Sequence, residues 1–220
     1  MTSLPVHFVI SFFVAAILGY FIGSVPVAYL LVRWKAKVDL RQAGSGNVGT
    51  LNSFEVTKSW LVGMTVLLLD ILKGLAAALI GGALVPANAG GAIFAGVAAV
   101  MGHNYPIWLS FRGGRGLATA SGAMLVVAWP VVGAWLALWG VSFLLLRQVN
   151  PANAMASALV LIGGILGPDD IVGPIGLRLF VISVMIVILI KHIEPVKSFL
   201  EELRARRRSG RPGPKEKTSQ

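Results

Sequence analysis

The chain has 220 residues, of which 56% are hydrophobic and only 13% are charged, and its formal net charge is +10. An average soluble domain carries about 25% charged residues, so a soluble fold of this length could not cover so much apolar surface. The absence of cysteine excludes disulfides, thiolate nucleophiles and cysteine-ligated metal sites. The composition therefore predicts an all-α integral membrane protein.

Seven apolar segments are expected along the chain. They cover residues 5–32, 60–84, 89–105, 117–128, 130–146, 152–166 and 171–190. We separate the fourth from the fifth near Pro130, because a proline inside a helix removes a hydrogen bond and forces a kink or a break. Segment 117–128 would rise only about 18 Å, which is too little to cross about 30 Å of hydrocarbon. We expect this short segment to be buried against its neighbours or to lie where the bilayer is thin.

The distribution of basic residues predicts the topology. Nine of the 19 Lys and Arg residues follow from Lys191 onward, and others fall in the polar stretches 33–58, 110–116 and 147–151. Cytoplasmic loops carry an excess of Lys and Arg, so we expect the N-terminus outside and the C-terminus in the cytoplasm. Arg178, toward the outer end of the last segment, is the exception. If 117–146 were one kinked helix, the basic tail would instead lie outside.

We expect two parts in the chain. Residues 1–193 form a single polytopic membrane domain, and residues 194–220 form a basic cytoplasmic tail that is disordered from Ser209 onward. A basic tail beside a span favours anionic lipid head groups as its partner. Nucleic acid is the alternative partner of such a tail, and we expect none, because nothing else in the chain resembles a nucleic-acid-binding module.

The first polar stretch contains a glycine-rich loop, DLRQAGSGNVGTLN, from Asp39 to Asn52. Glycines at alternate positions let backbone N–H groups turn toward one ligand and form an anion-binding nest. Arg41 adds a guanidinium that suits phosphate oxygens. The loop also supplies uncharged donors, which are Ser45, Asn47, Thr50 and Asn52. The alternative is a flexible turn between two spans; Arg41 and Ser45 favour a phosphate site.

The second loop reads GHNYP from Gly102 to Pro106 and then FRGGRGLAT from Phe111 to Thr119, where an apolar helical segment begins. Helix N-termini attract anions, and here two arginines are interleaved with glycines. The spacing of a Walker P-loop is absent, and no β-α-β pattern flanks the loop. The alternative is that Arg112 and Arg115 only mark the inner face of the membrane. The residues favour a second phosphate site over that alternative.

Three further polar features lie within or at the ends of spans. Asp70 and Lys73 share one helix face, where a structural ion pair is the favoured role and a functional cavity the alternative. His103 and His192 lie at the inner ends of spans, facing the same compartment as both loops. Either could donate a hydrogen bond or accept a proton, although a histidine at a membrane edge is often only an interfacial residue. No His-rich spacing suggests a metal site.

The two loops together resemble the signature of the PlsY family, the bacterial acyl-phosphate-dependent glycerol-3-phosphate acyltransferases. The family's first motif is close to D-L-R-x-x-G-S-G-N-x-G-A-T-N, and its second resembles G-H-x-[FY]-P-x(5)-F-[KR]-G-G-K-G-V-A-T. This chain has DLRQAGSGNVGTLN and GHNYPIWLSFRGGRGLAT at these places. The segment from Asp70 to Gly74 also resembles a D-x-x-K-G of the family. The resemblance covers the chain up to about residue 192.

The resemblance implies transfer of a fatty acyl group from acyl phosphate to the 1-hydroxyl of glycerol 3-phosphate, with lysophosphatidic acid and phosphate as products. It implies neither CoA nor a cofactor, a bacterial plasma membrane location, and a site at the cytoplasmic face. The acyl chain would lie in a groove between spans. The expected catalytic residues are Arg41, Ser45 and His192, and the expected substrate-binding residues are Gly44, Gly46, Asn47, Thr50, Asn52, Lys73, His103, Arg112, Gly113, Gly114, Arg115, Gly116 and Thr119.

The chain departs from the family pattern in several places. Pro195 stands where an asparagine is expected after His192, and the Gly-x-Glu element that usually follows is not evident. Arg115 replaces a lysine, and Thr50-Leu51 replaces Ala-Thr. Proline supplies no side-chain donor, and arginine keeps the charge of lysine but not its geometry. A catalytically divergent paralogue is therefore one alternative. A transporter of a phosphorylated or anionic solute is another, because short broken helices such as 117–128 occur in transporters.

Overall fold

The computed structural model describes residues 6–86 and 89–209, and the regular secondary structure of these residues is helical. The helices are α1 (Val6–Ser24), α2 (Val27–Ala36), α3 (Thr50–Thr57), α4 (Trp60–Leu84), α5 (Gly90–Asn104), α6 (Leu117–Val127), α7 (Trp129–Leu146), α8 (Val149–Leu166), α9 (Asp169–Val172), α10 (Ile175–Ile190) and α11 (Ile193–Ser209). Two short 3-10 helices, η1 (Leu40–Gln42) and η2 (Ile107–Leu109), lie in the two glycine-rich loops. The expected all-α class is confirmed.

Five helical stretches of the described residues are long and apolar enough to cross a membrane: Val6–Ala36, Trp60–Leu84, Gly90–Leu109, Trp129–Leu146 and Val149–Leu166. A sixth is possible if α10 and the following helix, which bend by 54° at their junction, form one span. The expected short segment is α6, and the chain breaks at Ala128, just before Pro130 in the first turn of α7. The total of seven segments and the orientation of the termini stay predictions.

The first apolar segment has a break that the sequence analysis did not anticipate. Helix α1 ends at Ser24 and α2 begins at Val27, with Pro26 between them. Proline has no N–H to continue the helical ladder, so the chain turns at this point. Lys73 of α4 donates a hydrogen bond to the carbonyl of Val25 at 3.0 Å, and this carbonyl also accepts the N–H of Val27 at 3.0 Å. A buried lysine thus bonds to the backbone at the break.

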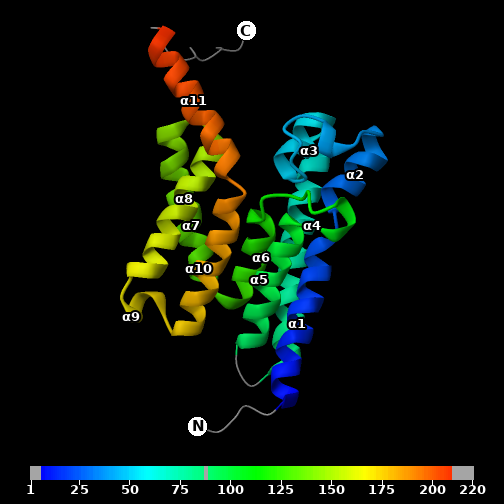
Figure 1. The fold of residues 1–220 in the computed structure, drawn as a ribbon, viewed down its shortest axis with the longest axis vertical. Coiled ribbons are helices and arrows are strands. Elements are labelled where there is room, and N and C mark those ends of the chain that lie inside the picture. Colours follow the sequence, from blue (N-terminus) through cyan, green and yellow to red (C-terminus); the bar gives the residue numbers. More distant parts are fainter. Residues whose placement is uncertain (1–5, 87–88, 210–220) are drawn as a thin grey trace.

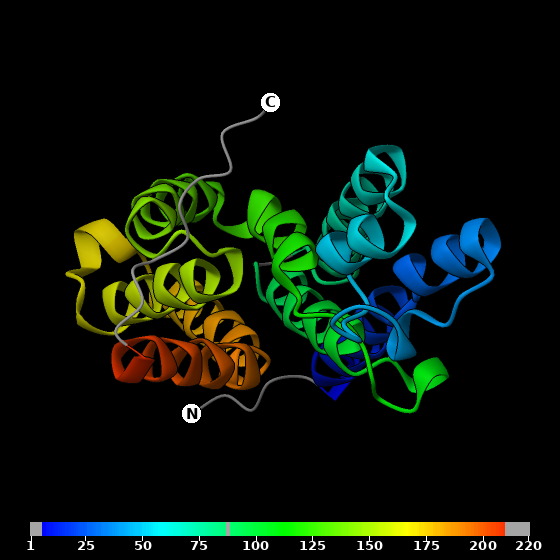
Figure 2. The ribbon, with the colours of Figure 1, turned by 90° about the horizontal axis from the view of Figure 1, so that it is seen from above.

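The helices form two groups, with α1, α4, α5 and α6 on one side and α7, α8 and α10 on the other (Figures 1 and 2). The first group packs through close backbone contacts. A Cβ built on Gly23 would lie 2.0 Å from the carbonyl oxygen of Ala99, and one on Gly122 would lie 1.9 Å from that of Ile71. Small residues at such crossings let membrane helices approach closely. Phe180 of α10, fully buried, packs between the groups against a core that includes Ala123.

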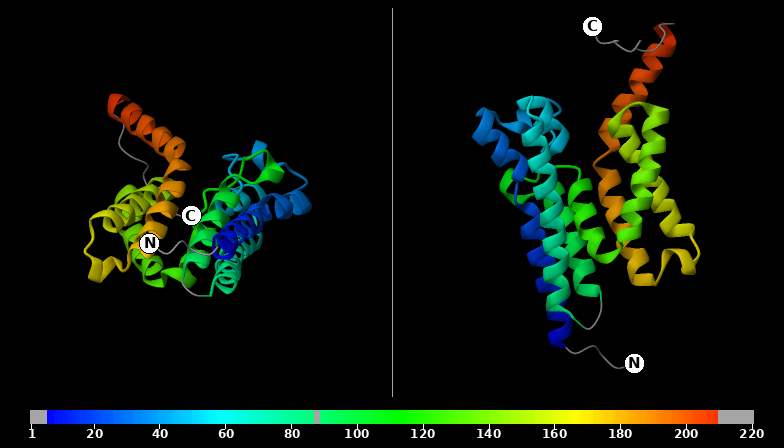
Figure 3. Two further views of the ribbon diagram at one scale, coloured as in Figure 1. Left: turned by 60° about the horizontal axis from the view of Figure 1, so that its bottom comes forward. Right: turned by 180° about the vertical axis from the view of Figure 1, so that it is seen from behind.

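Both glycine-rich loops lie at one end of the molecule, together with the α7–α8 junction and α11 (Figures 1 and 3). The opposite end holds α9 and the start of α1. There Arg178 pairs with Asp169 at 2.7 Å and donates to the carbonyl of Gly167 at 2.9 Å. Arg178 therefore caps the end of α8, and its unusual position does not require a transport pathway.

The basic segment after the last apolar helix continues as α11 as far as Ser209. Gln148 at the start of α8 donates to Glu202 of α11 at 3.2 Å, so the two elements touch. The tail predicted to be disordered from Ser209 onward otherwise lies outside the described residues.

Candidate active site

The first loop opens with an ion pair between Asp39 and Arg41. The Asp39 carboxylate caps η1 by accepting the backbone N–H of Arg41 at 2.9 Å, and it also accepts from Arg41 Nη2 at 2.6 Å. Hydrogen bonds from Arg41 lower the pKa of Asp39 to about 2, so the pair is fully ionised at neutral pH. The guanidinium also lies over the ring of Tyr29, 5.3 Å from its centre. Arg41 is thus oriented before any ligand arrives.

The side chain of Asn52 holds the first loop in shape through hydrogen bonds to its backbone. Its side-chain amide, 1% exposed, donates to the carbonyls of Leu40, Ala43 and Asn47 at 3.3, 3.0 and 2.9 Å. Its Oδ1 accepts the backbone N–H of Ser45 at 2.9 Å. Both polar atoms of this side chain are engaged by the loop. Asn52 therefore shapes the loop, and a ligand could reach its amide only by breaking these bonds.

Two glycines give the first loop its tight course. Gly44 and Gly46 have φ of +58° and +70°, in the left-handed region that side chains disfavour. A Cβ on Gly44 would also lie 2.1 Å from Asn52 Oδ1. Between them Ser45 is exposed, and its N–H is the one that Asn52 holds. The predicted nest is thus a rigid turn that presents Ser45 to solvent.

The second loop is held by its own backbone. The N–H of Gly113 donates to the carbonyl of Asn104 at 3.2 Å, and that of Gly114 donates to the carbonyl of His103 at 3.0 Å. These bonds satisfy the last carbonyls of α5. The two amides are therefore occupied, and the glycines serve to bring the loop close to the helix end. A Cβ on Gly114 would lie 2.0 Å from His103 Nε2 and 2.7 Å from the carbonyl oxygen of Val48 in the first loop.

Arg115 extends from the second loop toward α8, where its Nη1 donates to Asn150 Oδ1. Gly116, with φ of +85°, precedes the first turn of α6, and a Cβ on it would lie 2.6 Å from Asn104 Oδ1. Arg112 is exposed. The loop thus directs one of its two arginines inward, and that arginine is fixed by an amide from a distant helix.

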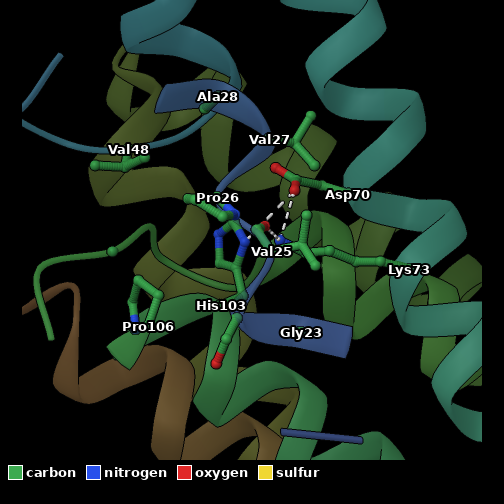
Figure 4. Close-up of a pocket in the computed structure, with 12 residues that line it drawn as sticks. Gly23, Val25, Pro26, Val27, Ala28, Val48, Asp70, Lys73, His103 and Pro106 are labelled. Carbon is green, nitrogen blue, oxygen red and sulfur yellow. Dashed lines mark hydrogen bonds and ion pairs between the residues drawn. The ribbon is translucent and has the colours of Figure 1, made fainter. Parts of the chain in front are cut away.

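A buried charged cluster lies beneath the two loops (Figure 4). Lys73 Nζ is 2.8 Å from Asp70 Oδ1, and His103 Nδ1 is 3.6 Å from the same oxygen. All three side chains are less than 10% exposed. The cluster joins α4 to α5, and through Val25 it also reaches the break between α1 and α2. Within the described residues, no group of three carboxylate or imidazole side chains is placed to hold a metal ion.

A cavity of about 650 Å³ lies between the loops and helices α3, α4, α6, α7 and α8. Its polar lining comes from both loops and from α3, α4, α5 and α8. These residues are Asn47, Gly49, Thr50, Asp70, His103, Arg115, Gly116, Asn150 and Asn153. The rest of the lining is almost entirely apolar and includes Leu67, Leu125, Val132, Trp135, Leu136 and Trp139. One cavity therefore joins a polar head to an apolar groove.

The structure brings some predicted site residues to this cavity and leaves others elsewhere. Asn47, Thr50, His103, Arg115 and Gly116 line it. Lys73 and Gly113 line a smaller adjoining cavity, with Asp70 and His103 shared between the two. The lining of the large cavity does not include Arg41, Gly44, Ser45, Gly46, Asn52, Arg112, Gly114, Thr119 or His192.

Thr119 and His192 are both buried between helices. The carbonyl of Thr119 faces Gly74 of α4 so closely that a Cβ there would lie 1.9 Å away. His192, 1% exposed, holds its Nδ1 2.9 Å from the carbonyl oxygen of Ile188, and its Nε2 has no hydrogen-bond partner among the described residues.

Sequence reasoning missed the polar contribution of α8. Asn150 binds Arg115, and Asn153 accepts a hydrogen bond from Trp139 Nε1 at 2.7 Å. The signal was present, because two asparagines three residues apart share one face of a helix in an apolar stretch. Polar residues inside spans commonly mark a site.

Comparison with known proteins assigns the chain to a family. A family model described as glycerol-3-phosphate acyltransferase matches residues 13–202. A glycerol-3-phosphate acyltransferase of Mesorhizobium japonicum is 39% identical over 146 residues, covering 66% of this chain and 73% of that protein. One of Rhodospirillum rubrum is 42% identical over 152 residues, covering 66% and 70%.

Solved structures agree with this assignment. The glycerol 3-phosphate form of PlsY, an integral membrane glycerol 3-phosphate acyltransferase, superposes with a TM-score of 0.74 at 31% identity, covering 87% of this chain and 93% of that chain. The lysophosphatidic acid form of PlsY gives a TM-score of 0.70 at 30% identity. The all-helical fold, the two loop motifs and these relatives show that the chain belongs to the glycerol-3-phosphate acyltransferase family and is a membrane-embedded acyltransferase.

Proposed function

We propose that the chain takes a fatty acyl group from acyl phosphate and transfers it to the 1-hydroxyl of glycerol 3-phosphate. The hydroxyl oxygen attacks the acyl carbonyl carbon, the bond from that carbon to the phosphate oxygen breaks, and 1-acyl-glycerol 3-phosphate and inorganic phosphate result. The observation that carries this proposal is the single cavity in which a polar head continues into an apolar groove. An acyl phosphate has the same division into an anionic head and an apolar chain.

The polar end can accommodate phosphate through groups from both loops. Arg115, fixed by Asn150, has N–H donors left for a phosphate oxygen, because a guanidinium carries five. Asn47 of the first loop and Thr50 at the start of α3 line the same end. We assign Arg115 and Gly116 to glycerol 3-phosphate, and Asn47 and Thr50 to the phosphate of the donor.

Arg41 and Ser45 remain the catalytic candidates of the first loop, although neither lines the cavity. Asp39 accepts from Arg41 Nε and Nη2, which leaves Nη1 and one further N–H free to reach a ligand. Ser45 is exposed on a turn whose backbone is fixed by Asn52. Both side chains therefore project from backbone that is already held by hydrogen bonds.

Positioning and charge stabilisation supply most of the proposed catalysis. His103 is buried against Asp70 and faces the second loop, so it serves to hold the site in shape. The proton of the attacking hydroxyl passes to a phosphate oxygen of a substrate. His192 is buried at the end of α10, and we keep it as a catalytic candidate through its unpartnered Nε2.

We propose a plasma membrane location with the loop end in the cytoplasm. Basic residues of the loop end include Arg33, Lys35, Arg41, Arg115, Arg147 and Lys191. At the opposite end of the described chain, Arg178 is paired with Asp169. An excess of Lys and Arg marks the cytoplasmic side. A reporter fused to the C-terminus tests this orientation, and an extracytoplasmic signal contradicts it.

The donor and the reaction are tested together with purified protein, palmitoyl phosphate and radiolabelled glycerol 3-phosphate. We expect labelled lysophosphatidic acid and an equal amount of released phosphate. A parallel reaction with palmitoyl-CoA should give neither. Product from palmitoyl-CoA alone would show that the donor assignment is wrong. Counterflow of glycerol 3-phosphate in proteoliposomes without any product would instead support a transporter.

The catalytic assignments are tested with Ser45→Ala and Arg41→Ala. Each should abolish turnover, while the helical content and thermal stability of the detergent-solubilised protein stay unchanged. Lys35→Ala is the matched control, because Lys35 is exposed on α2 and contacts neither loop through any observed hydrogen bond or ion pair in the described chain. Full activity in both loop variants would remove Ser45 and Arg41 from the mechanism.

A further inference from the structure

The apolar part of the cavity runs toward the corner between α6 and α7. Helix α6 ends at Val127, α7 begins at Trp129, and the linking Ala128 is only 3% exposed. Two helices that leave one corner diverge from it, so the space between them narrows toward the corner. The lining residues nearest the corner are Leu125 on α6 and Val132 on α7.

One wall of the groove is a fixed aromatic surface. Trp135 and Trp139 stack with ring centres 6.5 Å apart and planes inclined by 19°. Each indole N–H is bonded to α8, that of Trp135 to Ser157 Oγ at 3.0 Å and that of Trp139 to Asn153 Oδ1 at 2.7 Å. Rings held both by stacking and by a hydrogen bond to a neighbouring helix cannot rotate at low cost to admit a longer ligand. The wall therefore keeps its shape when a chain enters.

The distance from the polar head to the corner follows from helix geometry. The lining of α6 runs from Leu117 to Leu125, and eight residues of α-helix rise about 12 Å. An acyl chain whose donor phosphate lies at Asn47 and Thr50 would enter this stretch near Leu117 and run toward Val132. The length of the groove is thus set by the position of the α6–α7 corner.

We propose that Leu125 and Val132 set the acyl-chain length that this enzyme prefers, by meeting the terminal methyl of the chain at the α6–α7 corner. This proposal rests on the proposed function, because it takes the groove as the site of the donor's acyl chain. The groove is open along its side, since Leu125 and Leu136 are 46% and 55% exposed. A longer chain must therefore bend out toward lipid, and it loses the contacts of the corner.

The test is a chain-length profile of kcat/KM, measured with decanoyl, dodecanoyl, palmitoyl and stearoyl phosphate at saturating glycerol 3-phosphate. Val132→Ala should move the optimum to longer chains, and Val132→Phe should move it to shorter ones. We expect the long-to-short ratio to change by about tenfold in each direction, which is the discrimination that one or two methylenes give in an apolar pocket. Opposite shifts at one position cannot arise from a general loss of stability.

Val141→Phe is the matched control, because Val141 lies on the same helix, is 58% exposed and does not line the cavity. Its profile should equal that of the unmodified protein. Leu125→Phe tests the facing wall and should shorten the optimum even if Val132→Phe does not fold. An active enzyme whose profile is the same in all four variants would overturn the inference. No turnover of any acyl phosphate by the unmodified protein would instead refute the proposed donor.

Discussion

The first loop, residues 37–49, and the second loop, residues 105–116, lie at the same end of the molecule but are held in shape by different groups. One side chain, Asn52, gathers the backbone of the first loop through four hydrogen bonds. The second loop binds the end of α5 through backbone bonds, and it requires Gly113 and Gly114 because neighbouring atoms leave no room for a Cβ. The two loops meet where Gly114 faces Val48.

This difference indicates which changes each loop tolerates. The first loop depends on a side chain that can be removed without a steric clash, so its loss should leave a looser but accommodating turn. The second loop depends on the absence of side chains, so any addition forces atoms apart. Because Gly114 also touches the first loop and His103, a change there should disturb both loops at once.

Gly114→Ala is expected to have the largest effect. The new Cβ would lie 2.0 Å from His103 Nε2 and 2.7 Å from the carbonyl oxygen of Val48, so both must move. A misplacement of about 1 Å in a site can cost about 100-fold in rate, and we expect kcat/KM to fall at least that far. The control is Gly163→Ala, where no atom lies within 4 Å of the new Cβ. Equal activity of the two variants would show that the loops do not need this contact.

Asn52→Ala is expected to have an intermediate effect. It removes the donor to the carbonyls of Leu40, Ala43 and Asn47 and the acceptor for the N–H of Ser45. Of these groups, the carbonyl of Ala43 keeps another partner, the N–H of Gly46. The side chain that is lost is 1% exposed. Unpaired buried groups cost about 1–3 kcal/mol each, less where water enters, so we expect a loss of about 2–3 kcal/mol in unfolding free energy. Water can enter the loosened turn and bond to the groups that Asn52 leaves, so the total loss in unfolding free energy stays near 2–3 kcal/mol, on the order of one or two unpaired groups. Activity should fall about tenfold, since Ser45 is no longer held.

Ser53→Ala separates this effect from a general weakening of α3. The hydroxyl of Ser53 is equally buried, but it donates only to the carbonyl of Gly49 four residues earlier in the chain. We expect a small change in melting temperature and unchanged activity. Asn52→Asp should be as damaging as Asn52→Ala, because a carboxylate keeps the acceptor for Ser45 but loses the donors. If Asn52→Ala behaves like Ser53→Ala, the loop does not depend on Asn52.

The sequence allowed the main features of the fold to be predicted, because hydropathy and proline report on local structure. Helix α6 was expected at 117–128 and is found at Leu117–Val127, since Pro130 must fall in the first turn of the next helix. The break at Pro26 was missed. At this break Lys73 donates to the carbonyl of Val25, and the two residues are 48 positions apart in the chain. No local sequence pattern reveals such a distant partner.

The site was predictable only in part, because some of its residues come together only through contacts between distant parts of the chain. Loop motifs identified Asn47, Thr50, His103 and Arg115, which do meet in one cavity. The opposite wall comes from α7 and α8, whose distance from the loops depends on tertiary packing. Arg115 was expected to replace a lysine at some cost in geometry. The structure shows that Asn150 of α8 accepts a hydrogen bond from Nη1 of the Arg115 guanidinium.

Asn150→Ala is expected to have the smallest of these effects and to act only through Arg115. A hydrogen bond to a charged group is worth about 1.5–3 kcal/mol, so KM for glycerol 3-phosphate should rise about tenfold with little change in kcat. In an Arg115→Lys background the same substitution should add less than about twofold, because residues acting through one contact are not additive. Gln148→Ala is the control, because Gln148 does not line the cavity and is bonded to Glu202. Additive losses in this double-mutant cycle would mean that Asn150 meets the substrate itself.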